Sequence, residues 1–563
     1  MPWRETPPVA QQGGRQYRVL GGTARGRAFR LTPSHGLNEV TLEPRKTILW
    51  ADDEIDLLRP HVKMLEDRGF AVEGVSNGED AVYLVAKEGR RFDLVILDEM
   101  MPGIDGLETL QGIKAVDPSV PVIMVTKSED EDLADAAIRR EIDNYLVKPV
   151  NPLQVFTACR RLLDGARIRE SGVMRDYVEE FTLLRNLREG EKSPDVWLET
   201  HRKLADWDLR LDSFRDAGLL QTHEDAKHEA NVEFSRFVAS HYAGWISADP
   251  SDRPTLSVDI VRKFVAPLLR KKRKVYFIVL DCLRLDQWVA MEQLLEPFFD
   301  IRRHHYFSIL PTATPFSRNA IFSGLHPLQI ARKHPELWAM PGDDETSLNR
   351  HEHALLDAQL KRLGAAPGVP SKYVKVVTRA DANNLRKGLS GLYSLPLVSM
   401  VFNFIDILSH GRSDSDLLRE VAPDEAAFRS LAMAWFKHSA LFEILKAVSR
   451  QDATVVVTTD HGSIIGRHAS MVQGNRDTTT NLRFKIGSNL GCDTKHALHI
   501  KDPEAYQLPS MGLGTHYIIA RENYYFVYPT KFHEYERQFR GSFQHGGISL
   551  EEMVLPVAVM NPR

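Results

Sequence analysis

The sequence predicts a multidomain α/β protein with a doubly wound N-terminal domain, a helical spacer and a large α/β C-terminal domain. Three observations lead to this prediction. At about 150 residues per domain, a chain of 563 residues has room for three or four domains. Short apolar runs alternate with helical periods in two separate regions. Between these regions the strand-like runs vanish and charged helical stretches dominate.

The composition excludes several classes of protein. Charged residues make up 26% and hydrophobic residues 43%, which is ordinary for a soluble globular chain. With 72 basic and 76 acidic residues the net charge is −4. This overall charge does not indicate nucleic-acid or membrane binding. No apolar run approaches the length of a spanning helix, and residues 1–30 lack the apolar segment of a secretory signal. Three scattered cysteines are too few for a disulfide scaffold, so we expect a cytoplasmic protein without membrane insertion.

The first two segments differ sharply in pattern. Residues 1–44 are rich in Gly, Arg, Pro and Gln without periodicity, which predicts a disordered tail. Residues 45–165 carry five strand-like runs with helical stretches between them, and this alternation in about 120 residues indicates a parallel, doubly wound domain. The runs are Thr47–Ala51, Ala71–Val75, Asp93–Leu97, Val120–Val125 and Asn144–Val147.

The remaining chain divides into a helical part and a second α/β part. Residues 166–269 read as a helical bundle or spacer, with helical stretches such as Asp176–Leu187 and Ser193–Ala217. Residues 270–563 read as one large α/β domain, in which Ala453–Thr458 is among the clearest strands. The basic run 270–274 precedes a buried strand at Val275–Leu280. We interpret this run as a solvent-exposed edge at the start of that strand, which could also serve an anionic substrate.

Polar residues gather where the strands of the N-terminal domain end. Asp52 and Asp53 follow the first strand, Asp98 the third, Thr126 the fourth and Lys148 the fifth. These positions meet at the carboxyl edge of a doubly wound sheet. Three carboxylates there need a cation such as Mg²⁺, and a hydroxyl and an ammonium would hold phosphoryl oxygens. Asp98 would then be a nucleophile that forms an acyl phosphate, whereas any one acid alone could simply cap a helix.

The segments ILWADDE, DLVILDEMMPGIDGLETL, PVIMVTKSED and YLVKPV closely resemble a response-regulator receiver domain of the CheY type. The resemblance implies that Asp98 accepts a phosphoryl group from a sensor histidine kinase. It assigns Mg²⁺ binding, phosphate contacts and the aromatic switch to Asp52, Asp53, the Met100 carbonyl, Thr126, Lys148 and Tyr145. No DNA-reading motif follows, so the output is expected in the C-terminal domain.

A second set of polar residues has the composition of metal ligands. Asp281 follows the strand Val275–Leu280, and Asp460-His461 follow another strand. Asp406 and His410 are four residues apart, and His545 lies near the end of the chain. Imidazole nitrogens with carboxylate oxygens favour zinc, with Mn²⁺ as a competitor. Each signal is weak alone, and Thr312 or Thr314 could cap a helix that starts near Ser317.

The order of these residues resembles the alkaline phosphatase superfamily. PTATPFSRNAIFSG aligns with the nucleophile stretch of its nucleotide pyrophosphatase/phosphodiesterase branch, and TTTNLRFKIGSNL and FQHGGISLEEM resemble the PglZ domain. The resemblance implies that Thr314 attacks phosphorus. It further implies that one zinc ion is held by Asp281, Asp460 and His461 beside Thr314, and a second by Asp406, His410 and His545.

The sequence departs from that branch at one position. Ser317 stands where the branch has an asparagine that holds a phosphate oxygen. The residues that could replace it are Arg318, Asn319, Asn475, Arg476, Asn481, Arg483 and Lys485, although a solvated loop explains the later basic residues equally well.

The whole chain from about residue 45 resembles the PorX family of type 9 secretion system regulators. That resemblance implies cleavage of linear or cyclic oligonucleotides, a homodimer on phosphorylation and binding of an extracytoplasmic-function sigma factor. The first hypothesis is therefore a zinc-dependent phosphodiesterase under receiver control. The alternatives are a signalling adaptor with structural metals, and a metal-dependent phosphomonoesterase or phosphomutase.

Overall fold

A computed structural model describes most of the chain. It covers residues 46–87, 92–127, 142–190, 192–212, 214, 217–339, 349–365, 370–475, 478–479, 481–530 and 532–563, with the backbone alone at 164–172, 217, 414 and 416. The predicted tail and Arg476 lie outside these residues. The described residues form two compact units, which meet between residues 170 and 171. None of the helices in the described ranges combines the length and the hydropathy needed to span a bilayer.

The N-terminal unit is a parallel five-stranded sheet in the order β2-β1-β3-β4-β5. The strands are β1 (Thr47–Ala51), β2 (Ala71–Val75), β3 (Leu94–Asp98), β4 (Val122–Thr126) and β5 (Asn144–Val147). The helical segments are η1 (Ile55–Leu58), α1 (Arg59–Glu66), α2 (Gly78–Ala86), α3 (Gly106–Val116) and the start of α4 (Pro152–Glu189). One core joins the sheet to α2 and α3, and another joins it to α1 and α4. The doubly wound prediction is confirmed.

The helical segment shares its core with the C-terminal domain. It consists of the rest of α4, α5 (Pro194–Leu211) and α6 (Ala217–Ser247), so the stretch predicted as Ser193–Ala217 ends earlier. Trp197 and Phe234 pack edge to face at 5.5 Å, and Phe234 stacks on Phe307 of the C-terminal sheet. One apolar cluster contains all three side chains. These helices therefore form one compact unit with the domain that follows them.

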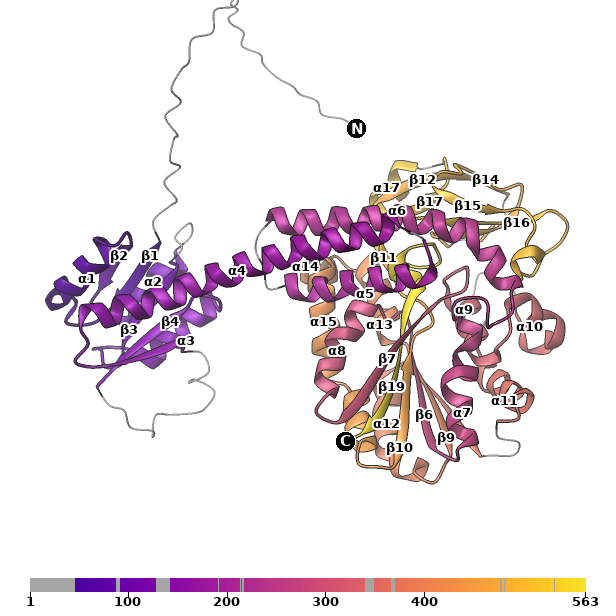
Figure 1. The fold of residues 1–563 in the computed structure, drawn as a ribbon, viewed down its shortest axis with the longest axis horizontal. Helices are drawn as coiled ribbons and strands as arrows, with labels where there is room; N and C mark the ends of the chain where they lie inside the picture. Colours follow the sequence, from indigo (N-terminus) through magenta and orange to yellow (C-terminus); the bar gives the residue numbers. More distant parts are fainter. Residues whose placement is uncertain are drawn as a thin grey trace, which may run out of the picture. The chain divides into compact units, whose positions relative to one another are not determined.

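The C-terminal domain is built on a six-stranded sheet in the order β7-β19-β10-β6-β9-β8, visible in Figure 1. The strands are β6 (Lys274–Leu280), β7 (Phe299–Phe307), β8 (Ser371–Val376), β9 (Leu397–Phe402), β10 (Ala453–Thr458) and β19 (Val554–Pro562). β6 is parallel to β9 and β10, whereas β19 is antiparallel to both of its neighbours. The side chains of β6 alternate between two apolar cores, which explains its uninterrupted apolar run.

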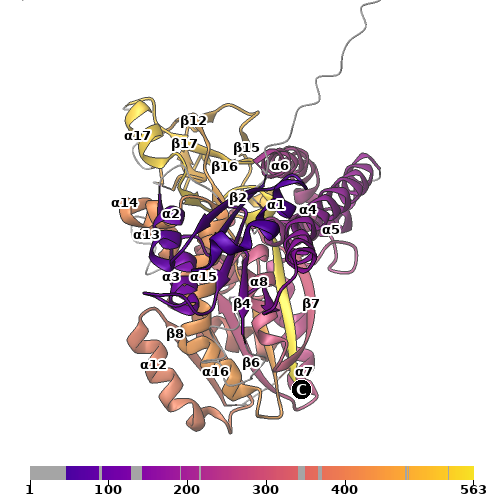
Figure 2. The same cartoon turned by 90° about the vertical axis from the view of Figure 1, so that its left-hand side faces the viewer.

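Helices cover both faces of this sheet. One face packs against α8 (Leu285–Leu295), α12 (Arg379–Gly388), α15 (Glu425–His438) and α16 (Ala440–Val448). The other packs against η4 (Val261–Val265), α7 (Ala266–Arg270), α9 (Thr314–Ser323), α10 (Pro327–Lys333) and α11 (Glu352–Arg362). Figure 2 shows α12 beside α16 and β8. The remaining longer helices are α13 (Phe404–Asp414), α14 (Asp416–Val421) and α17 (Phe532–Phe539).

Short strands complete the domain. Two of them, β11 (Ile464–Ile465) and β18 (Phe543–Gln544), pair antiparallel between the two histidine-bearing loops described below. The others form two three-stranded sheets, one of β12 (His468–Gln473), β14 (Gly491–Cys492) and β17 (Tyr524–Val527), and one of β13 (Phe484–Ser488), β15 (Ala497–Ile500) and β16 (Thr515–Ala520).

The basic run 270–274 lies at the amino end of β6, whereas Asp281 follows the carboxyl end. The seven residues of β6, the first of which is the last residue of the run, span about 23 Å. The run is therefore not the entrance to the predicted metal centre, because it sits at the opposite edge of the sheet.

Candidate active site and phosphorylation site

The carboxyl edge of the N-terminal sheet gathers Asp52, Asp53 and Asp98, with one ligand atom from each within 4.8 Å of the others. Lys148 Nζ lies 3.0 Å from Asp98 Oδ1 and 3.2 Å from Asp52 Oδ2. Burial raises the pKa of Asp98 above its usual value, and the charge of Asp52 adds to that rise against the hydrogen bond from Lys148. This crowding of acids beside one ammonium fits a Mg²⁺ site.

Of the other N-terminal residues predicted to act with Asp98, Thr126 ends β4 and Met100 follows β3 by two residues, whereas Tyr145 lies within β5 opposite Met124. The Thr126 hydroxyl donates to the Glu99 carboxylate. Met100 and Tyr145 are exposed, at 64% and 42% of their surface. The sheet order places the end of β4, with Thr126, between the ends of β3 and β5.

The first cluster in the C-terminal domain contains Asp281, Asp460 and His461, all fully buried. Their positions follow from β6 and β10, which are neighbours and end at the same edge. His461 Nε2 lies 3.8 Å from Asp281 Oδ1 and 3.8 Å from Asp460 Oδ2. His461 Nδ1 lies 3.1 Å from the Gly462 carbonyl, which accepts its proton and leaves the Nε2 lone pair facing the carboxylates.

Thr314 lies beside this cluster at the first residue of α9. Its Oγ1 is 2.9 Å from His461 Nε2 and 3.4 Å from Asp281 Oδ1. The helix begins three residues before the start predicted near Ser317, and its N-cap is Ala313, without a side-chain cap. Because the N-terminus of a helix favours negative charge, Thr314 stands where a phosphate group would be stabilised.

The second cluster contains Asp406, His410 and His545. Asp406 and His410 project from the same side of α13, one turn apart. Asp406 Oδ1 is 3.4 Å from His410 Nε2 and 3.7 Å from His545 Nε2, and the two imidazole nitrogens are 3.3 Å apart. The His410 side chain is 56% exposed, so this cluster opens to solvent whereas the first is enclosed.

The donor atoms of both clusters fit divalent cations. Ligands about 2.0–2.2 Å from a tetrahedral ion are separated from one another by about 3.3–3.6 Å. The second cluster matches this range closely, and the first is slightly wider. Asp460 Oδ2 and Asp406 Oδ1 are buried without a hydrogen-bond partner. Burying an acceptor without a hydrogen-bond partner costs free energy unless a cation or a donor contacts it.

Arg318 was predicted to contact the substrate, but it pairs with buried carboxylates instead. It is buried on α9, and its guanidinium lies 2.5 Å from Asp281 Oδ2, 2.5 Å from Glu352 Oε1 and 3.7 Å from Asp460 Oδ2. Asn403 Nδ2 also donates to Asp281 Oδ2, at 2.6 Å. Two donors therefore occupy Oδ2, and Oδ1 faces Thr314. Burial, together with the charge of Asp281, raises the pKa of Asp460 well above its usual value, and a bound divalent ion would favour the ionised form instead.

Several of the other predicted substrate contacts form hydrogen bonds with other groups of the protein. The Ser317 hydroxyl lies 2.9 Å from Ser308 Oγ, and Asn319 Nδ2 donates to the Pro315 carbonyl at 2.9 Å. Further along the chain Asn475 donates to Ser488, Lys485 to the Thr479 carbonyl and Arg483 to Glu552, while Asn481 is half-buried. The structure thus brings Ser317, Arg318 and Asn319 near Thr314 through α9, whereas the hydrogen bonds given for Asn475, Arg483 and Lys485 are with other parts of the domain.

Sequence reasoning did not identify Glu352, Asn403 or Glu552. Glu352 and Asn403 lie in segments without a motif, so nothing in their spacing linked them to Asp281. Glu552 belongs to no ligand-like pattern either, although it follows His545 by seven residues in the segment FQHGGISLEEM. Its carboxylate accepts from the Gly547 N–H at 2.8 Å and pairs with Arg483, so it supports the loop that carries His545.

Three family models match the chain. They describe a response regulator receiver domain at residues 48–160, a PorX response regulator linker domain at 167–246 and a BREX system PglZ alkaline phosphatase-like domain at 260–560. The last of these covers more than half of the chain.

The curated relatives match a smaller share of this chain than the PglZ family model does. The cyclic di-GMP phosphodiesterase response regulator RpfG of Xanthomonas campestris pv. campestris is 30% identical over 188 residues, 33% of this chain and 48% of that protein. The transcriptional regulatory protein ResD of Bacillus subtilis is 33% identical over 119 residues, 21% of this chain and 48% of that protein. The chain thus spans about half the length of these relatives. A solved CheY-like receiver domain from Methanospirillum hungatei aligns at 25% identity with 22% of this chain and 99% of its own, at a TM-score of 0.20.

Proposed function

This chain belongs to the PglZ alkaline phosphatase-like family in the arrangement of a PorX-like response regulator, and we propose that it is a phosphodiesterase controlled by phosphorylation of Asp98. The observation that carries the proposal is the place of Thr314. Its hydroxyl is poised at a helix N-terminus between Asp281 Oδ1 and His461 Nε2, beside a second, open ligand cluster. A structural metal site would need no hydroxyl there.

The proposed reaction uses Thr314 Oγ1 as the nucleophile. The oxygen loses its proton to solvent and bonds to phosphorus, the bond from phosphorus to the leaving oxygen breaks, and that oxygen takes a proton from water. Water then hydrolyses the bond between Oγ1 and phosphorus in the threonyl phosphodiester, which releases a phosphomonoester and restores the hydroxyl. Divalent ions, when bound, supply positive charge that lowers the pKa of the attacking hydroxyl and offsets charge on the departing oxygen.

We propose zinc for both clusters, because three imidazole nitrogens and three carboxylates suit it, with Mn²⁺ as the competitor. Asp281, Asp460 and His461 would hold one ion, and Asp406, His410 and His545 the other. In the receiver domain Asp53 and Asp98, with Asp52 and the Met100 carbonyl, would hold Mg²⁺. Thr126 and Lys148 would contact the phosphoryl group on Asp98, and Tyr145 would respond to it.

For substrate and partners we propose a linear or cyclic oligonucleotide, a sensor histidine kinase, a sigma factor and a second copy of the chain. Receiver domains imply a phosphodonor such as a histidine kinase. RpfG is named as a cyclic di-GMP phosphodiesterase response regulator, which is a precedent for joining these two activities. The adaptor and phosphomonoesterase hypotheses remain the alternatives to be tested.

Hydrolysis of bis(p-nitrophenyl) phosphate tests the activity. The wild-type protein with zinc should turn over the diester, and Thr314→Val should lose at least about 10³-fold in rate while it keeps its zinc. Thr222→Val, on the exposed side of α6, is the control for a lost surface hydroxyl. Equal and negligible rates in wild type and Thr314→Val, with zinc bound, would favour the adaptor. Faster hydrolysis of p-nitrophenyl phosphate would favour the monoesterase.

Beryllofluoride, which mimics a phosphoryl group, tests the control by Asp98. The diesterase rate of the wild type should change when it is added with Mg²⁺, and the rate of Asp98→Asn should not. An unchanged wild-type rate would argue against receiver control while leaving the esterase proposal intact.

A further inference from the structure

A four-residue helix, α18 (Leu550–Met553), lies against the loop that follows β10 and against the segment that leads to Thr314. The Glu552 carbonyl accepts from the Gly462 N–H at 3.2 Å, directly after His461. The Met553 carbonyl accepts from the Ser308 N–H at 2.8 Å. The position of α18 therefore fixes the backbone next to a metal ligand and the start of the nucleophile segment.

The same helix also fixes the loop of the second cluster. The Glu552 carboxylate accepts from the Gly547 N–H, two residues after His545. Ser308, held by α18 through its N–H, donates its hydroxyl to the Asp460 carbonyl at 2.7 Å. A shift of α18 would thus move ligands of both clusters together.

The linker helix α6 holds α18 from its other side. Asn231 Oδ1 accepts from the Leu550 N–H at 2.7 Å, and Asn231 Nδ2 donates to both carboxylate oxygens of Glu551, at 3.2 and 3.0 Å. Asn231 and Glu551 are each 4% exposed. The consecutive residues Glu551 and Glu552 therefore face opposite partners, the first facing the linker and the second facing the catalytic loops.

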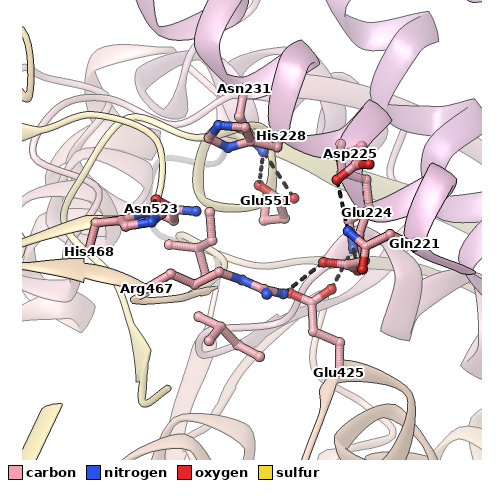
Figure 3. Close-up of a pocket in the computed structure, with 13 residues that line it drawn as sticks. Gln221, Glu224, Asp225, His228, Asn231, Glu425, Arg467, His468, Asn523 and Glu551 are labelled. Atoms are coloured by element: carbon pink, nitrogen blue, oxygen red, sulfur yellow. Dashed lines mark hydrogen bonds and ion pairs between the residues drawn. The ribbon is translucent and has the colours of Figure 1, made fainter. Parts of the chain in front are cut away.

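The contact lines a cavity of about 170 Å³ between α6 and the strand that follows His461. Figure 3 shows Asn231 above Glu551, with the dashed hydrogen bonds between them, and Arg467 reaching from the opposite wall toward Glu224. Arg467 NH2 is 2.7 Å from Glu224 Oε2, so α6 has a second polar contact in the same cavity that does not involve α18. The two contacts can be separated by mutation.

We infer that Asn231 is a positioning residue through which the linker sets the geometry of both metal-ligand loops by way of α18. The linker then acts on the active site by a defined route, from α6 through Glu551 to the loops of His461 and His545. The inference rests on the proposed function for its effect on turnover. Its effect on the loops themselves is independent of catalysis.

A polarity swap tests this route. Asn231→Asp sets two carboxylates against each other and should push α18 away. Glu551→Gln should behave like the wild type, because its amide oxygen can still accept from Asn231. The double variant N231D/E551Q should be rescued, because the new carboxylate at position 231 can accept from both the Leu550 N–H and the new amide at position 551. Arg467→Gln is the matched control in the same cavity.

Two measurements on the full chain follow the loops directly. Amide hydrogen exchange in metal-free protein should be at least about tenfold faster for residues 460–466 and 545–553 in N231D, and should return to the wild-type rate in the double variant. Zinc retention against a chelator should fall and recover in parallel. If N231D does not fold, Asn231→Ala, which removes the donor without adding charge, replaces it in both measurements.

Three results would overturn the inference: unchanged exchange and zinc retention in N231D, no rescue in the double variant, or an equal effect in Arg467→Gln. Absence of diester hydrolysis in the wild type would instead contradict the proposed function. Exchange and zinc retention would still decide the role of Asn231 in that case.

Discussion

At the scale of single residues, the orientation of Asp281 decides what the first cluster can do. Arg318 and Asn403 hold its Oδ2, so Oδ1 is the oxygen that faces Thr314 and His461. Arg318 is itself held by Glu352, whose other oxygen accepts from the Tyr373 hydroxyl. A series of buried side chains thus turns one carboxylate oxygen of Asp281 toward the proposed metal site, as hydrogen-bond partners outside the ligand shell do in known metal sites.

Replacing Arg318 tests this arrangement. Arg318→Met leaves three buried carboxylates without a compensating cation, so we expect a loss of about 3–5 kcal/mol in the free energy of unfolding, measured with urea in metal-free protein. Zinc affinity should fall as well, because Asp281 loses its fixed orientation. Arg429→Met, which removes another buried guanidinium from Asp286 and Asp212, should cost stability but leave zinc affinity unchanged. Equal zinc affinity in Arg318→Met and wild type would contradict the assigned role.

Lys485 gives a prediction for pH. Burial lowers its pKa to about 7 in the folded protein, against 10.5 for an ordinary lysine. Between these values the unfolded chain binds more protons than the folded one, so this group makes stability rise with pH, by at most about 1.4 kcal/mol per pH unit. Urea unfolding of wild type and Lys485→Met across that range should show the rise in the wild type alone. Parallel curves for the two proteins would show that Lys485 stays protonated.

At the scale of elements, two helices position the side chains of the candidate active site. α9 begins at Thr314 and so sets the hydroxyl at a helix N-terminus, while its second turn carries Arg318 into the interior. α18 needs close approach of the loop after β10, and Gly462 makes this possible. A Cβ on Gly462 would lie 2.0 Å from the Glu551 carbonyl oxygen.

Gly462→Ala should therefore disturb the site. The added methyl group must push the His461 loop and α18 apart, at a cost of about 1–3 kcal/mol in unfolding free energy, with weaker zinc retention. Gly388→Ala is the control, because no atom lies within 4 Å of a Cβ there and the residue ends α12. Thermal unfolding and zinc content of both variants provide the measurement. A Gly462→Ala protein with wild-type zinc retention would show that the loop can move without loss of the ligands.

At the scale of the whole molecule, the direction of the large sheet separates its two edges. β6, β9 and β10 are parallel, so the residues after their carboxyl ends meet, and Asp281, Asn403 and Asp460 form one site. The basic run 270–274 lies at the other edge. The linker helices, in contrast, share a core with this domain and reach the loops at the active edge.

Because the basic run lies at the opposite edge of the sheet from Asp281, we expect that neutralising it has no effect on substrate binding. Lys271 and Lys272 are exposed in the turn before β6. Replacing both with glutamine should leave KM for an anionic dinucleotide within about twofold of the wild type, because about 23 Å of strand separates them from Asp281. Steady-state kinetics at low salt is the sensitive test. A several-fold rise in KM would mean that the substrate extends around the sheet to this edge.

The amino-acid sequence alone was enough to predict the architecture and the strand-end positions of several candidate site residues. Apolar strands buried on both faces leave an uninterrupted pattern, and ligands at strand ends follow it immediately, so Asp98, Asp281 and Asp460 were predictable from local sequence. The helical spacer was predicted as helices, and the start of α9 was misplaced by three residues because Thr314 and Pro315 form its first turn rather than precede it.

Which polar residues reach the candidate site and which support it became clear from the three-dimensional structure. Arg318, Arg483 and Lys485 look alike in sequence, yet Arg318 pairs with Glu352, Arg483 pairs with Glu552, and Lys485 is buried and donates to the Thr479 carbonyl. The two carboxylates come from segments dozens of residues away, and pairing at such separation leaves no periodic signal. The contact of Asn231 with Glu551 joins residues 320 positions apart. Long-range packing of buried charges, rather than local pattern, therefore sets the final form of the site.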